Sequence, residues 1–284
     1  MDQQKSLDIT YLNQWMGREE VAVDLLEIGL LNRIGAFFEL PSAFSRGDPI
    51  PETWHWCFFH VPRAQAELGH DGHPRTGGFL PPFELPRRMW GGSRLHFHRP
   101  LVAGEAAEKI SRIASVDLKR GKSGTLGLVT VEHRITQGGN LCRTEEQDII
   151  YREAATAANA ALTLVDCPDG SENTREVAPD PVMLFRYSAL TYNAHRIHYD
   201  RSYAQSEEGY AGLVVHGPLT SSFLADFARQ LRNGAPLQSF SFRGTSPLFD
   251  GEVFHLHAKA EPDALRLWAQ RPDGGMAMAA KAKF

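Results

Sequence analysis

Cysteine is scarce in this chain of 284 residues. The three cysteines, Cys57, Cys142 and Cys167, lie far apart and form no C-x-x-C pair. An odd number of isolated cysteines argues against a disulfide framework and against a zinc ribbon, and it is typical of a reducing compartment. Cys57 falls in the aromatic run WHWCFF, which favours a buried apolar side chain over a nucleophile.

Long apolar runs and a large excess of either charge are missing as well. The chain has no run of apolar residues long enough to span a membrane, and its start, MDQQKSLDIT, resembles neither a secretory signal nor a transit peptide. A net charge of −4 gives no general attraction to nucleic acid or to an acidic membrane. We therefore expect a cytoplasmic protein without nucleic-acid or membrane partners.

The first half of the chain changes from helical to strand patterns. Residues 7–31 and 33–40 carry helical apolar spacing, and residues 53–61 resemble a strand. The segment 62–88 is rich in Gly, Pro, His and Arg, which predicts a long surface loop, and such loops are usually functional or mobile. From Ser93 onward, alternating runs separated by Gly-rich breaks predict an antiparallel sheet with one wet and one dry face.

The second half repeats this order after a segment without clear periodicity. Residues 154–181 are small and polar, which predicts a linker between an N-terminal domain of residues 1–153 and a C-terminal domain of residues 182–284. A strand-like run at 185–191 and a helix at 218–233 precede four further strand patterns. The sequence therefore predicts an α+β fold, in which each half packs one long helix into a curved antiparallel sheet.

The polar segment before the predicted C-terminal helix carries the candidate chemistry. Asn193, His195 and His198 lie within six residues, and Gly217 and Pro218 mark the start of the helix. Unpaired N–H groups and the positive dipole end at a helix start favour an oxyanion.

Three interpretations of this segment are open from the residues alone. His195 and His198, with Asp200 nearby, could bind zinc or iron. The histidines could instead only hydrogen-bond the loop. In the third interpretation, a general base lies beside an amide that orients water, and the helix start at Gly217 receives a developing oxyanion.

The strings ALTYNAHRIHYDRSYA and EGYAGLVVHGPL resemble the signature of the hot-dog-fold hydratases related to MaoC and the (R)-specific enoyl-CoA hydratases. They are most similar to the double hot-dog branch that includes mesaconyl-CoA hydratase, itaconyl-CoA hydratase and the mitochondrial 3-hydroxyacyl-thioester dehydratases. The first half matches this branch through ETWHWCFF, LPRRMWGGSRLHFHRPL and TEEQDIIYRE. The resemblance implies a double hot-dog fold with the active site in the C-terminal domain. A degenerate N-terminal domain is expected to cover part of this site.

One departure from the wider family pattern bears on mechanism. That pattern has an Asp, an Asn two residues later and a His three residues after that, and these positions correspond to Asn193, His195 and His198. A carboxamide orients water but exchanges no proton at neutral pH. The narrower branch carries the same Asn form, so the resemblance implies an active site in which His198 does the acid–base work.

The reaction implied by the resemblance is reversible addition of water to the α,β double bond of an acyl thioester. His198 takes a proton from the water that Asn193 holds, and the N–H of Gly217 stabilises the enolate oxygen. The resemblance implies an acyl-CoA substrate and neither a metal nor a cofactor.

Five further residues are candidates for substrate binding. Arg196 and Arg88 could pair with a free substrate carboxylate or remain solvated. His195, His216 and Tyr203 could contact the substrate, or they could pack, cap and cover the helix.

Within the branch we expect a hydratase of a branched C5 dicarboxylyl-CoA, converting itaconyl- or mesaconyl-CoA to citramalyl-CoA, as in itaconate degradation. A 3-hydroxyacyl-ACP or -CoA dehydratase of fatty-acid metabolism is the alternative within the same chemistry. A non-catalytic acyl-thioester-binding module and a thioesterase on the same fold are alternatives of other classes. Exposed sheet edges favour a further homodimer.

Overall fold

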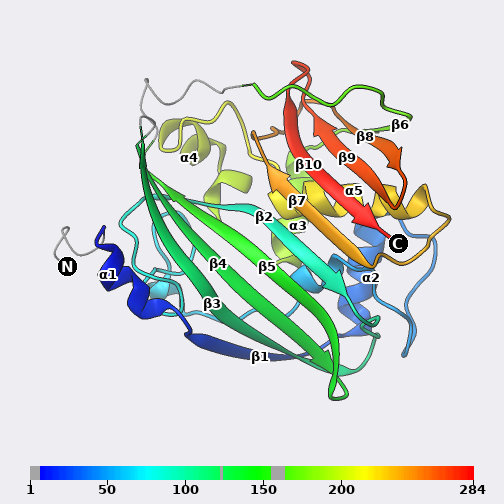
Figure 1. Cartoon of the computed structure of the whole chain (residues 1–284), viewed down its shortest axis with the longest axis horizontal. Helices are drawn as coiled ribbons and strands as arrows, with labels where there is room; N and C mark the ends of the chain where they lie inside the picture. Colours follow the sequence, from blue (N-terminus) through cyan, green and yellow to red (C-terminus); the bar gives the residue numbers. More distant parts are fainter. Residues whose placement is uncertain (1–6, 122–123, 155–163) are drawn as a thin grey trace.

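One continuous antiparallel sheet runs through the molecule, whose computed structural model describes residues 7–121, 124–154 and 164–284 (Figure 1). Its strands are β1 (Glu19–Leu25), β2 (Arg87–Phe97), β3 (Ala106–Gly121), β4 (Gly124–Gln137), β5 (Asn140–Arg152), β6 (Asn173–Val177), β7 (Ser239–Gly244), β8 (Phe254–Glu261), β9 (Ala264–Gln270) and β10 (Met276–Lys283). They pair in the order β1-β3-β4-β5-β2-β7-β10-β9-β8-β6, so each half of the chain forms one half of the sheet.

The two halves meet where β2 pairs with β7. Leu95 lies opposite Phe240, and Gly92 lies opposite Arg243. A Cβ atom on Gly92 would lie 2.4 Å from the carbonyl oxygen of Phe242, so only glycine permits this close approach. Hydrogen bonding across this seam makes the halves parts of one sheet.

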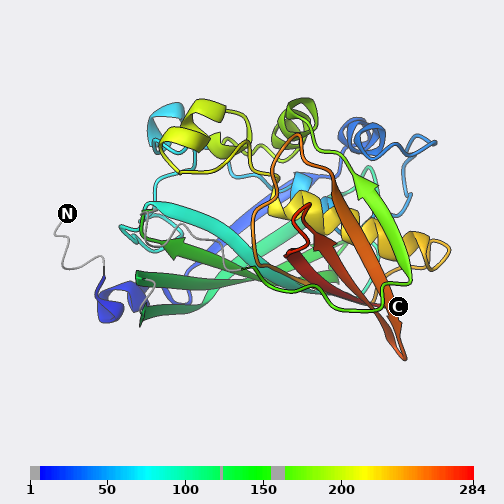
Figure 2. The same cartoon turned by 90° about the horizontal axis from the view of Figure 1, so that it is seen from above.

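Helices cover one side of the sheet (Figure 2). The α-helices are α1 (Ile9–Leu12), α2 (Ile28–Phe37), α3 (Pro181–Leu190), α4 (Arg201–Ser206) and α5 (Gly217–Gln230), and the short 3-10 helices are η1 (Asn13–Trp15), η2 (Trp54–Cys57), η3 (Gln65–Glu67) and η4 (Arg196–His198). Leu31 and Ile34 of α2 are buried in the N-terminal core, and Leu219 and Leu224 of α5 are buried in the C-terminal core. The predicted α+β architecture, with one helix packed on a sheet in each half, is confirmed.

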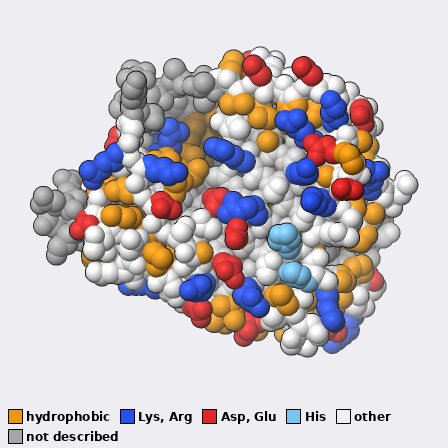
Figure 3. Space-filling model, viewed as in Figure 1, with side chains coloured by type: hydrophobic (Ala, Val, Ile, Leu, Met, Phe, Trp, Pro, Cys, Tyr) orange, Lys and Arg blue, Asp and Glu red, His pale blue; other side chains and the backbone are white. Residues whose placement is uncertain are grey.

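The other side of the sheet is polar. Acidic and basic side chains alternate across it in the space-filling view (Figure 3). Arg94, for example, donates hydrogen bonds to Glu146 and Asp148 on the neighbouring strand. This side is the solvent-exposed face that the alternating strand patterns predict.

Three predicted elements differ from the structure. Residues 19–25 form β1 instead of continuing a helix, because their side chains alternate and the strand pairs with β3. The predicted strand at 53–61 forms no strand: residues 54–57 are the 3-10 helix η2, which buries Trp54 and Cys57, and residues 58–61 are irregular. The strand-like run at 185–191 belongs to helix α3, whose start is fixed by the Asp180 side chain and by Pro181.

The segment predicted to link the domains also contains ordered structure. Strand β6 lies within residues 154–181 and pairs with β8, so this part of the segment belongs to the sheet of the C-terminal half. Residues 155–163 of the predicted linker lie outside the described residues.

Strands β1 and β6 form the two edges of the sheet, and dimerisation through such an edge stays a prediction. Among the helices described, none combines the length and the apolar composition needed to cross a membrane.

Candidate active site

A cavity of about 1400 Å³ lies where the two halves meet. Its wall from the N-terminal half includes His73, Arg88 and Trp90, and its wall from the C-terminal half includes Asn193 and His198. The segment predicted as a surface loop, residues 62–88, therefore contributes directly to the wall of the site.

His198 ends the short helix η4 and is buried. Its Nδ1 lies 2.7 Å from the carbonyl oxygen of Val214. Because a carbonyl only accepts, Nδ1 carries the hydrogen and Nε2 keeps a lone pair. Burial, followed by the neighbouring rings of His216 and His195, lowers the pKa of His198 well below its usual value. His198 is therefore a neutral imidazole with a free acceptor nitrogen at neutral pH.

His216 packs against the ring of His198. The two rings stack with centroids 3.6 Å apart and planes 17° apart. His216 is fully buried, its Nε2 lies 2.8 Å from the hydroxyl of Ser188, and burial lowers its pKa to about 3. It is absent from the cavity wall among the described residues, so its position is that of a packing partner of His198 and not of a substrate contact.

Asn193 is held rigidly on the cavity wall. Its backbone N–H donates to the carbonyl of Ser188 at the end of α3. Its side-chain oxygen accepts from the backbone N–H of His195 at 2.9 Å, an Asx turn that fixes the carboxamide. The amide group therefore lies in the cavity in one defined orientation.

Gly217 is the first residue of α5 and also lines the cavity. The N–H of a first helical residue has no partner within the helix, and Pro218 has no N–H at all. A Cβ atom on Gly217 would have the carbonyl oxygen of Trp90, at 3.9 Å, as its nearest neighbour. Gly217 therefore lies at the cavity wall at the start of α5, and its role as an oxyanion donor stays a prediction.

Of the predicted substrate-binding residues, Arg88 and His195 line the cavity. Within the described chain, Arg88 has no acidic partner within ion-pair distance. His195 is buried, and its Nε2 lies 3.6 Å from Oε1 of Glu208, beyond hydrogen-bond distance. Arg87, the neighbour of Arg88, is instead engaged by Glu208 and by the hydroxyl of Tyr210.

Arg196 and Tyr203 lie behind the wall, because neither is among the described residues that line the cavity. The Arg196 guanidinium donates to Asp200 at 2.8 Å and lies 4.2 Å above the ring of Tyr203. The Tyr203 hydroxyl donates to Glu208. These contacts join η4 to α4, so Arg196 and Tyr203 stabilise the segment that carries His198.

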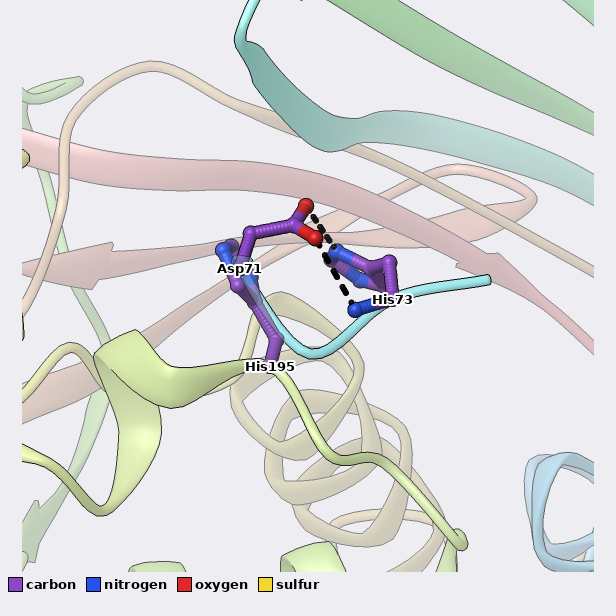
Figure 4. Close-up of side chains that lie close together, drawn as sticks. All are labelled: Asp71, His73 and His195. Carbon is purple, nitrogen blue, oxygen red and sulfur yellow. Dashed lines mark hydrogen bonds and ion pairs between the residues drawn. The ribbon is translucent and has the colours of Figure 1, made fainter. Parts of the chain in front are cut away.

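Asp71 and His73 complete the site and are absent from the predicted set. Asp71 Oδ2 lies 2.9 Å from His73 Nδ1, and the His73 ring lies 4.2 Å from the ring of His195 (Figure 4). Burial, aided by the charge of Arg88, lowers the pKa of His73 to about 3. Against the opposing effect of burial, the hydrogen bonds from His73 lower the pKa of Asp71 to about 2. The only sequence signal was the unusual composition of their loop.

Two histidines and a carboxylate form a donor set that suits zinc or iron, and one ligand atom from each of Asp71, His73 and His195 lies within 4.8 Å of the others. The set is not the one considered from the sequence, because Asp200 is occupied by Arg196 and by the start of α4. Asp71 and His73 are also hydrogen-bonded to each other.

Comparison with known proteins assigns the chain to a family. Residues 53–250 match the family described as hydroxyacyl-thioester dehydratase type 2. The chain belongs to this family. It is 47% identical over 268 residues to a protein of Chloroflexus aurantiacus named mesaconyl-C(4)-CoA hydratase, and the match covers 94% of this chain and 95% of that protein.

Two solved structures with low sequence identity to this chain show the same fold. A MaoC-like dehydratase superposes with a TM-score of 0.70 at 15% identity, over 95% of this chain and 98% of that one. A Mycobacterium tuberculosis protein described as a double hot-dog superposes with a TM-score of 0.59 at 14% identity, over 94% and 95% of the two chains. The double hot-dog fold and the MaoC-like resemblance are confirmed. This family member is a hydro-lyase, which confirms the predicted enzyme class and sets aside a purely binding role.

Proposed function

We propose that this hydro-lyase hydrates a branched C5 dicarboxylyl-CoA, itaconyl- or mesaconyl-CoA, and forms citramalyl-CoA. The observation that carries the proposal is Arg88, a cavity-lining guanidinium without an acidic partner among the described residues. The Chloroflexus relative, named for a mesaconyl-CoA substrate, supports the same acyl class. Such a substrate has a free carboxylate, which an arginine binds through paired hydrogen bonds.

The size and charge of the cavity support a CoA thioester. Small-molecule sites usually measure roughly 300–1,000 Å³, whereas this cavity measures about 1400 Å³ and suits a long ligand. Arg75 and Arg152 also line it and are available to CoA phosphates, whereas the lining Arg63 is paired with Glu20.

The proposed reaction uses groups whose geometry is described above. His198 Nε2 takes one proton from the water while its oxygen bonds to Cβ of the acyl group. In mesaconyl-CoA the double bond is conjugated with the thioester carbonyl, so the π electrons move through Cα onto the thioester oxygen, where the N–H of Gly217 stabilises the charge. Itaconyl-CoA reaches the same step after its double bond shifts into conjugation, with loss of a proton from Cα and gain of a proton at the terminal methylene carbon. One oxyanion donor of this kind contributes about 3–4 kcal/mol. The proton on His198 then passes to Cα as the carbonyl re-forms, which completes a net addition of water.

The test is to incubate the purified protein with mesaconyl-, itaconyl-, crotonyl- and a medium-chain enoyl-CoA and to identify products by chromatography. We expect citramalyl-CoA from the C5 dicarboxylyl thioesters and little product from the linear ones. Hydration of the linear thioesters alone would contradict the proposal and favour the dehydratase of fatty-acid metabolism, which the family description supports. Release of free CoA from a saturated acyl-CoA would instead reveal a thioesterase.

A further inference from the structure

The loop of the N-terminal half that carries Asp71 and His73 is fixed against the segment that carries Asn193. The backbone N–H of Arg196 donates to the carbonyl of Asp71 at 2.9 Å. Gly72 has a φ of +90°, and a Cβ there would lie 1.9 Å from the carbonyl oxygen of Ala194. Any side chain at this position would push the two segments apart. The contact therefore holds the Asp71–His73 pair at the reaction site.

The hydrogen bonds of Asp71 define which nitrogen of His73 is free. One carboxylate oxygen accepts from the backbone N–H of His73 at 3.0 Å, and the other lies 2.9 Å from Nδ1 (Figure 4). An ionised carboxylate only accepts, so Nδ1 carries the hydrogen and Nε2 keeps its lone pair. The low pKa of His73 keeps the ring neutral at physiological pH.

The reacting water needs two acceptors, since it has two hydrogens and its oxygen must face the acyl group. His198 supplies one acceptor. Asn193 is a weaker acceptor than the carboxylate of the wider family, because its one side-chain oxygen is uncharged and already accepts from the backbone of His195, while its NH₂ group only donates. The oxygens of Glu208 face Arg87 and Tyr203. His73 lines the same cavity as His198, and the ring of His195 lies 4.2 Å from the ring of His73 and 5.5 Å from the ring of His198.

We propose that His73 is a further catalytic residue of this site, the second acceptor for the reacting water, and that Asp71 is the positioning residue that fixes its tautomer. This inference rests on the proposed hydration. One water hydrogen passes to His198 as the oxygen bonds to Cβ. The other stays on the new hydroxyl group, hydrogen-bonded to His73 Nε2 throughout. The N-terminal half thereby replaces the acceptor that is lost where Asn193 stands instead of a carboxylate.

Three variants separate this role from a merely structural one. His73→Ala removes the acceptor, and we expect kcat to fall about 100-fold with KM within threefold of wild type. His73→Gln places an amide oxygen near the position of Nε2 and should retain more of kcat than His73→Ala. Asp71→Asn lets the amide donate to Nδ1, which moves the ring hydrogen to Nε2, so kcat should fall at least tenfold.

The matched control is His70→Gln, in the same loop but exposed and outside the described cavity wall, for which we expect wild-type kcat. Melting temperatures of all variants report folding, and added imidazole should partly restore kcat to His73→Ala. A kcat within threefold of wild type in folded His73→Ala would overturn the inference. So would stoichiometric zinc binding that raises wild-type kcat and is lost in His73→Ala, because the cluster would then be a metal site.

Failure of this inference can be told apart from failure of the proposed function. If the wild type hydrates no enoyl-CoA, the proposed function itself fails. If the wild type is active, His198→Ala is inactive and His73→Ala is unimpaired, only the role of His73 fails.

Discussion

The N-terminal half contains two carboxylate–histidine pairs with the same contact distance and different surroundings. Glu145 lies 2.9 Å from His55, and Asp71 lies 2.9 Å from His73. The first pair is enclosed: the other ring nitrogen of His55 lies 3.0 Å from Nη1 of the buried Arg143 and accepts from it, and Glu145 also accepts from Ser93. In the second pair, one ring nitrogen of the histidine is unused and the ring lines the cavity.

Residue types alone therefore do not determine the role of a carboxylate–histidine pair. Both nitrogens of His55 are hydrogen-bonded, so no acceptor remains for a substrate or for water. Nε2 of His73 has no hydrogen-bond partner among the described residues, and the side chain lines the cavity. We expect the enclosed pair to control stability and the open pair to control turnover, and the following measurements test that contrast.

The largest effect on turnover is expected at His198. Replacing His198 with Ala removes the proposed base, and kcat should fall about 10²- to 10⁴-fold. His255→Ala, a substitution on the outer part of strand β8, is the control and should keep wild-type kcat. Steady-state kinetics with the C5 dicarboxylyl thioester measure both variants. Equal kcat values would refute the assignment of the base.

The largest effect on stability is expected at Glu145. Glu145→Ala leaves Trp56 and the buried His55 and Ser93 without the carboxylate that accepts from them and should lower the free energy of unfolding by about 3–5 kcal/mol. The neighbouring, exposed Glu146→Ala breaks only a surface contact with Arg94 and should cost less than about 1 kcal/mol. Urea unfolding compares the two. Similar losses would show that the enclosed network contributes no special stability.

A smaller and substrate-dependent effect is expected at Arg88. Arg88→Gln removes the guanidinium proposed to bind the free carboxylate, a contact worth about 1.5–3 kcal/mol, so kcat/KM for mesaconyl-CoA should fall roughly 10- to 100-fold. Activity on crotonyl-CoA, which has no second carboxylate, should change little. Arg94→Gln, on the same strand but pairing with Glu146 on the polar face, is the control. Equal losses on both substrates would contradict a carboxylate-binding role.

The smallest expected effect is a displaced pH profile. His198 acts as a base only when neutral, and burial lowers its pKa well below 6.5. Activity should therefore persist as the pH falls through 6.5 and decline only when the pH passes the lowered pKa. The pH dependence of kcat/KM, measured above the onset of acid unfolding, tests this. An acid limb centred at or above 6.5 would be inconsistent with the neutral, buried imidazole.

The contribution of the enclosed Glu145–His55 pair to stability should also depend on pH. Against the opposing effect of burial, the hydrogen bond from His55 lowers the pKa of Glu145 from 4.5 to about 2. A carboxyl group with a lowered folded-state pKa stabilises the protein above its unfolded pKa, and this stability is lost as the pH falls. Stability should therefore decline between about pH 4.5 and pH 2, and Glu145→Gln should flatten this dependence. An unchanged slope in that variant would assign acid sensitivity to other groups.

Local patterns predicted much of the fold. The strands from Ser93 to Arg152 alternate in polarity, and β4 and β5 are joined by the expected turn at Gly138 and Gly139. The start of α5 followed from Gly217 and Pro218. The prediction was wrong for α3, because its apolar residues look strand-like over a short window, while the cap at Asp180 decides the conformation.

The candidate site was predictable mainly in its C-terminal part, and in the N-terminal half only Arg88 was among the predicted residues that line the cavity. Asn193, His198 and Gly217 are close in sequence or mark a helix start, so their grouping is visible in the letters. His73 lies more than a hundred residues from His195, and no periodicity connects them. Their contact depends on the strand pairing that joins the halves and on the close approach of Gly72 to Ala194.

Three features can be predicted from the sequence alone: the alternating strands, the start of helix α5 at Gly217, and the histidine that is the proposed base. These depend on the chemistry of neighbouring residues. Folding of the whole chain is needed to place Arg88 on the cavity wall without an acidic partner among the described residues, and to bring one of the two carboxylate–histidine pairs to the cavity. Those properties depend on which hydrogen-bonding groups remain unused after folding, and that is fixed by contacts between segments far apart in the chain.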